Sequence, residues 1–245
     1  MHEALGLGER AGRIAGFLSA PWFAAGSWLR QARVLHPRGQ TYEARVVPSA
    51  GRGQALGERL AGQALVRCSG AMWKRPVPWF EVLGVAVRFR GAHAASPVPE
   101  TDDQDLLFAT IRRPWTLATA PWLTDASDYL HDDYFAVSPF DTPELGRVYF
   151  RLRPARVGKV QGTRPERLEE AVWRDEARFV LSARPAWHLG WVEIATIELV
   201  TRALLDDDAL RFSPFRTGRQ IVPRGFVHAL RPSVYKASQH ARPGS

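Results

Sequence analysis

The chain is poor in cysteine and lysine. Cys68 is its only cysteine in 245 residues, and Lys74, Lys159 and Lys236 are its only lysines. One cysteine excludes an internal disulfide and a cysteine-rich metal site, and it makes a reducing cytoplasm the expected compartment. Nearly all of the 33 basic residues are therefore arginines, whose planar guanidinium pairs well with carboxylates and phosphates.

Long apolar runs are also missing. No stretch of about 18 consecutive apolar residues occurs, so no transmembrane helix is predicted. The nearest approach is 14–29, which Pro21 and two glycines interrupt and which no clean signal-peptide cleavage site follows. We expect this segment to be an amphipathic leader that packs on the domain, with contact to a membrane surface as the alternative.

The formal net charge is +8 and the isoelectric point about 10.3. Such a balance permits nucleic-acid binding, but acidic residues are interleaved almost everywhere except in 231–245. No recognition helix and no aromatic–basic RNA motif is present in the sequence. We therefore expect an acidic small molecule as the partner, and no specific nucleic acid.

Patterns of period two predict an antiparallel barrel within an α+β fold. Alternating side chains predict strands at 41–47, 63–69, 83–90, 104–110, 146–155, 176–185 and 189–200. Residues 112–143 are rich in Trp, Pro, Asp and Tyr and predict short helices and loops, whereas 164–176 predicts a helical turn. Seven or eight strands with short links and few helical crossovers favour a barrel.

The domain organisation is expected to be simple. Residues 1–32 predict an N-terminal helical arm, and 33–245 a single barrel domain whose loop-like end, 210–239, wraps the outside. No period of 20 to 50 residues repeats and no linker divides the chain.

Several short motifs, in serial order, resemble the core of the heme catalase superfamily. RVLHPRG (33–39) resembles that family's Arg-x-x-His-Ala-(Lys/Arg)-Gly, and LVRCS (65–69) its Val-Arg-Phe-Ser. EVLGVAVRF (81–89) and QDLLFAT (104–110) resemble the next two strand motifs. FSPF (212–215) and VPRGFVHALRPSVY (222–235) resemble the motifs near the end of that core.

The resemblance implies a catalase-like barrel and roles for four residues. His36 matches the distal histidine, which moves a proton between the oxygens of bound peroxide. Ser69 matches the serine that orients this imidazole. Arg33 and Arg67 match arginines that hold the heme propionates. The family's N-terminal arms cross between subunits, so a homo-oligomer formed through the arm is a further expectation. A lone His36 would otherwise be interpreted as part of a helix-to-strand turn shaped by Pro37 and Gly39.

The chain departs from the family at two positions. The distal asparagine falls near Ala109 or Thr110, where only Thr110 can donate a hydrogen bond. The segment that carries the proximal tyrosine ligand of the iron has no counterpart in this sequence, since Tyr235 matches a different tyrosine. Tyr235 or His240 could replace that ligand only if the tail folds inward.

Three functions stay open. The barrel could bind heme and carry out peroxidase-type chemistry on peroxide with His36, Ser69 and Thr110. It could instead be heme-free and bind an apolar or acidic small molecule gripped by Arg33 and Arg67. It could also be a phosphate-ester hydrolase, suggested by the two arginines and by HDD at 131–133.

Two remaining features are expected to be structural. HDD at 131–133 is more typical of a solvated loop than of a metal site, because converging ligands cannot be identified and no metal ligand is predicted. Cys68 lies between Arg67 and Ser69 in a strand, so its side chain should point opposite to both and pack in the interior.

Overall fold

The computed structural model describes residues 39–70, 81–112, 116, 119–136, 138–155, 161–205 and 209–224. Its strands are β1 (Gly39–Pro48), β2 (Gly62–Gly70), β3 (Leu83–Gly91), β4 (Gln104–Ala109), β5 (Tyr134–Ala136), β6 (Phe140–Thr142), β7 (Gly146–Pro154), β8 (Arg178–Pro185), β9 (Val192–Arg202) and β10 (Val222–Pro223). The described helices are α2 (Gln54–Leu60), α3 (Ala120–Leu123) and α4 (Arg164–Trp173).

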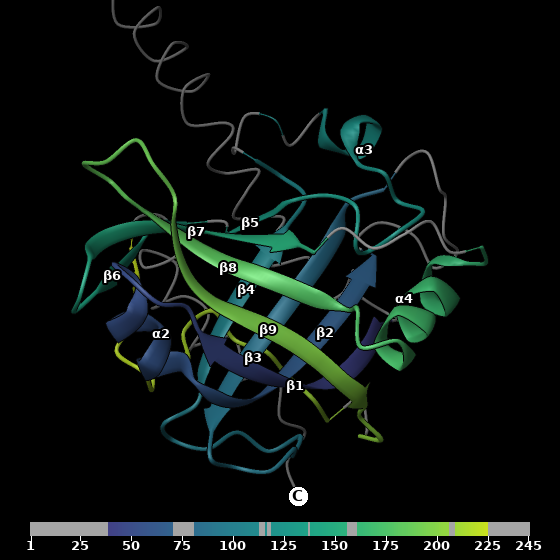
Figure 1. The fold of residues 1–245 in the computed structure, drawn as a ribbon, viewed down its shortest axis with the longest axis horizontal. Coiled ribbons are helices and arrows are strands. Elements are labelled where there is room, and N and C mark those ends of the chain that lie inside the picture. The colour runs from purple at the N-terminus through teal and green to yellow at the C-terminus, as the bar shows by residue number, and fades with distance from the viewer. Residues whose placement is uncertain are drawn as a thin grey trace, which may run out of the picture.

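Eight strands form a closed antiparallel barrel. They pair in the order β7-β5-β4-β3-β2-β1-β9-β8, and β8 returns to β7 to close the ring. Figure 1 shows β8 and β9 crossing in front of β2, β3 and β4. The short strand β6 also pairs with β7, and β10 pairs with β6, so both extend the same sheet.

Alternation along the strands fills the inside of the barrel with apolar side chains. On β2 and β3, every second residue belongs to one buried cluster, including Val66, Cys68, Val85 and Val87. Phe108, Phe150 and Phe179 add to this cluster from other strands. These buried side chains form one contiguous cluster, so the barrel interior is an apolar core.

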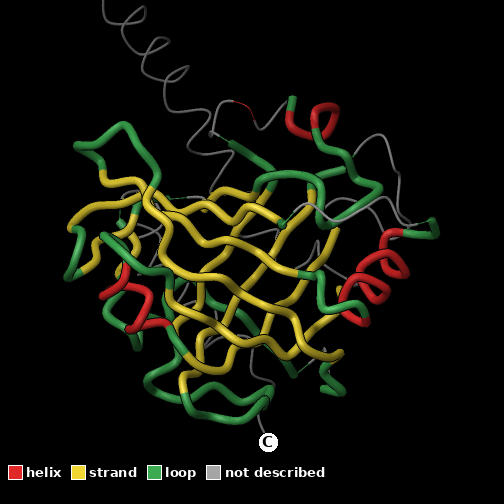
Figure 2. Tube along the Cα trace, in the orientation of Figure 1, coloured by secondary structure: helices red, strands yellow, loops and turns green. Residues whose placement is uncertain are grey.

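The helices lie at the two ends of the barrel (Figure 2). α4 connects β7 to β8 where β1 begins, and α2 connects β1 to β2 where β8 ends. We call these the α4 end and the α2 end. Gly53 and Gly57 allow α2 to lie against β9, because a Cβ on either would come within 2.2 Å of a backbone oxygen of β9.

The predicted barrel is confirmed, and the seven predicted strands correspond to β1, β2, β3, β4, β7, β8 and β9. The eighth strand, β5, lies in the segment for which short helices and loops were expected. The helical turn predicted at 164–176 is confirmed as α4, whereas α2 lies in a Gly-rich stretch predicted as a link. The predicted arm, 1–32, is outside the described residues.

No helix in the described part of the chain is long and apolar enough to cross a bilayer. Of the predicted C-terminal wrap, residues 222–223 instead form β10 in the sheet, and Ile221 joins the core. Residues 210–219 lie over the outer face of β3 and β4, where the amide of Asp105 donates to the carbonyl of Arg216 at 3.2 Å. Gly218 allows this contact, since a Cβ there would come within 2.3 Å of the Asp102 backbone.

Candidate functional site

Arg67 and Ser69 lie together on the outer wall of the barrel. Their strand neighbours Val66 and Cys68 point into the core, so the alternation of β2 directs Arg67 and Ser69 outward. The prediction that Cys68 packs inside is confirmed. Burial raises the pKa of its thiol to about 12, although the charges of Arg67 and Arg164 oppose this shift.

Register places small side chains beside these two residues. Arg67 pairs with Ala86, which pairs with Leu107, so the three side chains form one row across β2, β3 and β4. All three are half-buried. The adjacent row consists of the small residues Gly39, Ser69, Gly84 and Ala109. We call Arg67, Ser69, Ala86 and Leu107 the outer-wall patch.

The guanidinium of Arg67 lies against the backbone of Gly39. A Cβ at Gly39 would come within 2.7 Å of Arg67 Cζ, so a larger residue there would displace the guanidinium. Arg67 and Ser69 both make further interactions and are not free side chains. A guanidinium carries five N–H donors, so an engaged arginine can still bind an anion.

The other predicted site residues are distributed differently. Thr110 is outside the patch, because its Oγ1 accepts from the Leu83 amide at 3.1 Å and bonds Thr124 Oγ1 at 2.9 Å. His36 and Arg33 lie outside the described residues. His36 precedes Gly39 by three residues, a length of chain that spans at most about 10 Å.

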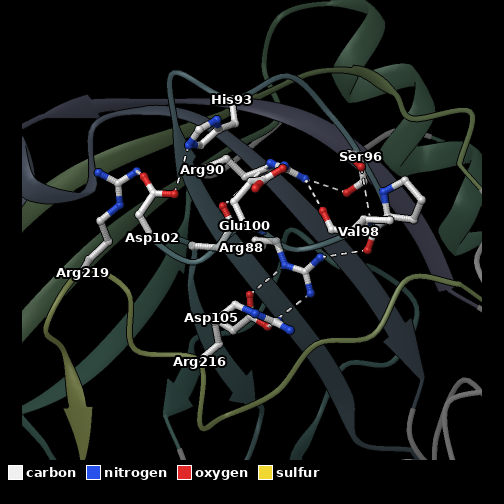
Figure 3. A network of polar contacts seen from close by, with 12 residues as sticks. Arg88, Arg90, His93, Ser96, Val98, Glu100, Asp102, Asp105, Arg216 and Arg219 are labelled. Carbon is white, nitrogen blue, oxygen red and sulfur yellow. Dashed lines mark hydrogen bonds and ion pairs between the residues drawn. The ribbon is translucent and has the colours of Figure 1, made fainter.

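A network of buried charges borders the patch on one side (Figure 3). Arg88 is the next outward residue of β3 after Ala86 and is fully buried beneath residues 210–216. Its Nε donates to Asp105 Oδ1 at 3.0 Å, and its Nη1 to the carbonyl of Pro97 at 3.3 Å. Arg216 also donates to Asp105, whose Oδ2 accepts from the Ser213 amide at 2.8 Å.

The same network continues along β3 and into the following loop. Arg90 is 1% exposed, and its Nη1 donates to the carbonyl of Ser96 at 2.7 Å. Asp102 accepts from Arg219 at 3.1 Å and contacts His93 at 3.0 Å near the surface. These contacts hold residues 91–103 and 210–219 against the barrel, so the network fixes one border of the patch.

A second buried ion pair lies at the α4 end of the barrel. Arg164 of α4 contacts Glu81 at 3.2 Å, and both side chains are buried. The Arg164 guanidinium also lies 4.8 Å from the ring centre of Tyr129. Burial raises the pKa of Tyr42, Tyr129 and Tyr134 above the ordinary range, so these phenols are neutral.

The HDD segment forms a loop in which the three side chains contact different partners. His131 is largely exposed and lies 3.9 Å from Asp125, while Asp132 accepts from the Asp125 amide at 2.7 Å. Asp133 pairs with Arg151. Within the described ranges, no group of three His, Cys, Asp or Glu side chains is close enough to hold a metal ion.

Sequence reasoning did not identify the charge network around Arg88 and Asp105. The signal available was two arginines at successive outward positions of one strand, Arg88 and Arg90, and acidic residues beginning the next strand. Arginine is rarely buried in proteins, so hydropathy alone gives no indication that these two side chains are covered.

Two comparisons with known sequences give no match. No family model matches the chain, and no curated protein shows significant sequence similarity to it. The resemblance to heme catalases therefore stays a prediction based on the order of short motifs.

Proposed function

We propose that this protein binds an apolar, acidic small molecule at the outer-wall patch, with Arg67 gripping its carboxylate or phosphate. The observation that carries this proposal is the row Arg67–Ala86–Leu107, where a half-buried guanidinium stands beside two half-buried apolar side chains. A cation next to an apolar surface suits a ligand with an acidic head and an apolar body. Because Arg67 points away from the apolar cluster inside the barrel, the proposed ligand lies on the outer wall.

His36 and Ser69 would allow proton transfer to or from the bound ligand. Ser69 pairs in register with Gly39, and the chain that leads back from Gly39 to His36 is short enough to bring the imidazole near the patch. An imidazole beside an anion-binding guanidinium can donate a proton to, or accept one from, a ligand. Arg33 precedes His36 by three residues and would supply a second cation.

Heme is one acid that the patch could hold. Arg67 could bind a propionate, but the adjacent row of small residues offers no open surface, since Ser69 is 4% exposed and Ala109 is 0% exposed. The buried tyrosines in the described part, Tyr42, Tyr129 and Tyr134, belong to the core cluster, so their hydroxyls do not face the outer wall where the iron would lie. The described residues thus fit the carboxylates of heme but not its iron, and the proposal includes no peroxidase step.

The test is a titration with two anionic probes, 1-anilinonaphthalene-8-sulfonate and hemin. Arg67→Gln should weaken binding of the sulfonate by at least about tenfold, because a charge-assisted hydrogen bond is lost. Arg45→Gln is the matched control, since Arg45 is an exposed arginine of the neighbouring strand that pairs with Glu198. Equal affinity of the wild type and both variants would rule out the patch as the binding site.

The hemin arm separates the two ligand classes. A Soret band that develops on titration, and that weakens in His36→Ala, would favour the heme protein. A protein that binds the sulfonate through Arg67 but takes up no hemin would be the heme-free binder. Thermal unfolding of each variant shows whether a lost signal reflects lost folding.

A further inference from the structure

The loop between β8 and β9 exposes two large apolar side chains at its tip. Trp187 is 67% exposed and Leu189 is 96% exposed. The loop leaves the barrel at the α2 end and projects beyond it, at the upper left of Figure 1. Large apolar residues grouped at a projecting tip mark an interaction surface more strongly than single exposed residues do.

The loop has a defined local conformation. The amide of Ala186 donates to the carbonyl of Arg147 at 2.8 Å, which ties the start of the loop to β7. The His188 amide donates to the carbonyl of Pro185 at 3.0 Å, and the Gly190 amide donates to His188 Nδ1 at 3.0 Å. The turn therefore presents Leu189 outward from a held backbone.

Arginines surround this tip and stack on aromatic rings. The guanidinium of Arg52 lies 5.6 Å from the ring centre of Trp187. Arg184 lies 5.4 Å from the ring centres of both Tyr149 and Trp191. Neither Arg52 nor Arg184 forms an ion pair with a carboxylate anywhere in the described ranges. A guanidinium that stacks on a ring keeps its charge and its N–H groups available to a phosphate.

We propose that the β8–β9 loop docks the protein on an anionic membrane surface. Trp187 and Leu189 enter the boundary between headgroups and acyl chains, and Arg52 and Arg184 bind lipid phosphates around them. Tryptophan prefers this boundary, and arginines near a negatively charged leaflet strengthen adsorption. The net charge of +8 acts in the same direction.

The structure favours a membrane over single-stranded nucleic acid. Bases bind aromatic side chains by stacking on open ring faces. Here Arg151, at 4.3 Å, and Arg184, at 5.4 Å, lie over Trp191, and Arg184 also lies over Tyr149, so successive bases would not find a row of open rings beside Trp187. In addition, Leu189 at the apex offers apolar surface to lipid but no stacking platform to a base.

The test is flotation with vesicles of phosphatidylcholine, with and without about one-third phosphatidylserine. The wild type should float with the anionic vesicles and less with the neutral ones, and salt should weaken its binding. Leu189→Ser should weaken partitioning into the vesicles about tenfold, because the apolar surface of Leu189 is then no longer buried in lipid. Arg184→Gln should weaken partitioning about fivefold, because one positive charge near the lipid phosphates is lost.

Leu204→Ser is the matched control. Leu204 is also 96% exposed, but it follows β9 at the α4 end, away from the loop. Its substitution should leave flotation unchanged. Wild type that stays with the soluble fraction, or Leu189→Ser that floats like the wild type, overturns the proposal, because any membrane contact would then come from another part of the chain.

Two further measurements identify the competing partners. Binding of an oligothymidylate that depends on Arg184, without flotation, would show that the loop binds nucleic acid instead. Self-association in sedimentation equilibrium without lipid, abolished by Leu189→Ser, would show that the tip contacts a second copy of the chain. Either result replaces the membrane proposal.

Discussion

Asp105 provides the sharpest test of how the outer face of the barrel is held. Its carboxylate is fully buried and accepts from Arg88, Arg216 and the Ser213 amide. Asp105→Asn keeps the shape of the side chain but removes the negative charge. Arg88, which is 0% exposed, is then left as a buried cation without a counter-charge. Breaking a buried ion pair in this way costs about 3–5 kcal/mol.

Asp141→Asn is a matched control for this substitution. Asp141 also pairs with two arginines, Arg147 at 3.3 Å and Arg224 at 2.6 Å, but all three side chains are partly exposed. Ion pairs at the surface contribute about 0–1 kcal/mol, so the control should lose little stability. The two variants thus differ mainly in burial.

The assay is urea denaturation followed by far-UV circular dichroism. Asp105→Asn should lower the free energy of unfolding by at least about 2 kcal/mol more than Asp141→Asn does. This difference is a large part of the total stability expected of a domain, about 5–15 kcal/mol. Equal losses in the two variants would refute the view that the Asp105 pair is the buried anchor of residues 210–219.

Four other outcomes are expected. The thiol of Cys68, whose pKa burial raises to about 12, should react with a disulfide reagent only after the protein is denatured, and prompt reaction of the native protein would contradict this. Tyr134→Phe should lower the free energy of unfolding by about 1 kcal/mol because the Tyr134 hydroxyl donates to a backbone carbonyl at 2.8 Å. Tyr42→Phe should lower the free energy of unfolding less, since the buried Tyr42 hydroxyl has no hydrogen-bond partner among the described residues. Hydrogen bonds from Ser127 lower the pKa of Asp125, and the Thr163 amide lowers the pKa of Glu166. Both carboxylates therefore contribute stability that is present above about pH 4 and is lost as the pH falls below it. The double variant Asp125→Asn, Glu166→Gln should reduce the loss of stability between neutral and acid pH, measured by urea denaturation at each pH.

The barrel strands could be predicted because period-two patterning reports which strand faces are buried. The prediction that Cys68 points opposite to Arg67 and Ser69 needed only this alternation, and it is confirmed. The strand β5 was missed because its three residues are too few to show a period. The helix α2 was missed because the link that contains it is rich in glycine, which disfavours a helix prediction. Two of these glycines, Gly53 and Gly57, allow close packing on β9.

The surroundings of the candidate site could not be predicted in the same way. Local sequence places Arg88 on the outer face, but only the return of residues 210–216 to β3 buries it. That return depends on pairing between Asp105 and Arg216, which are more than a hundred residues apart. Burial on the outside of a barrel is a property of what covers it, and a strand pattern carries no information about the covering segment.

The register of β2 is the physical link between fold and proposed function. A shift of one residue would turn Arg67 into the apolar core and Cys68 onto the wall. The paired side chains on β2 and β3 exclude this shift, because Val66 and Val87 face each other inside while Arg67 and Ala86 face outward. The register irregularity between Gln63 and Ala64 lies at the α2 end, before this stretch. The packing of the core therefore fixes the position of Arg67, although the core residues themselves are not part of the outer-wall patch.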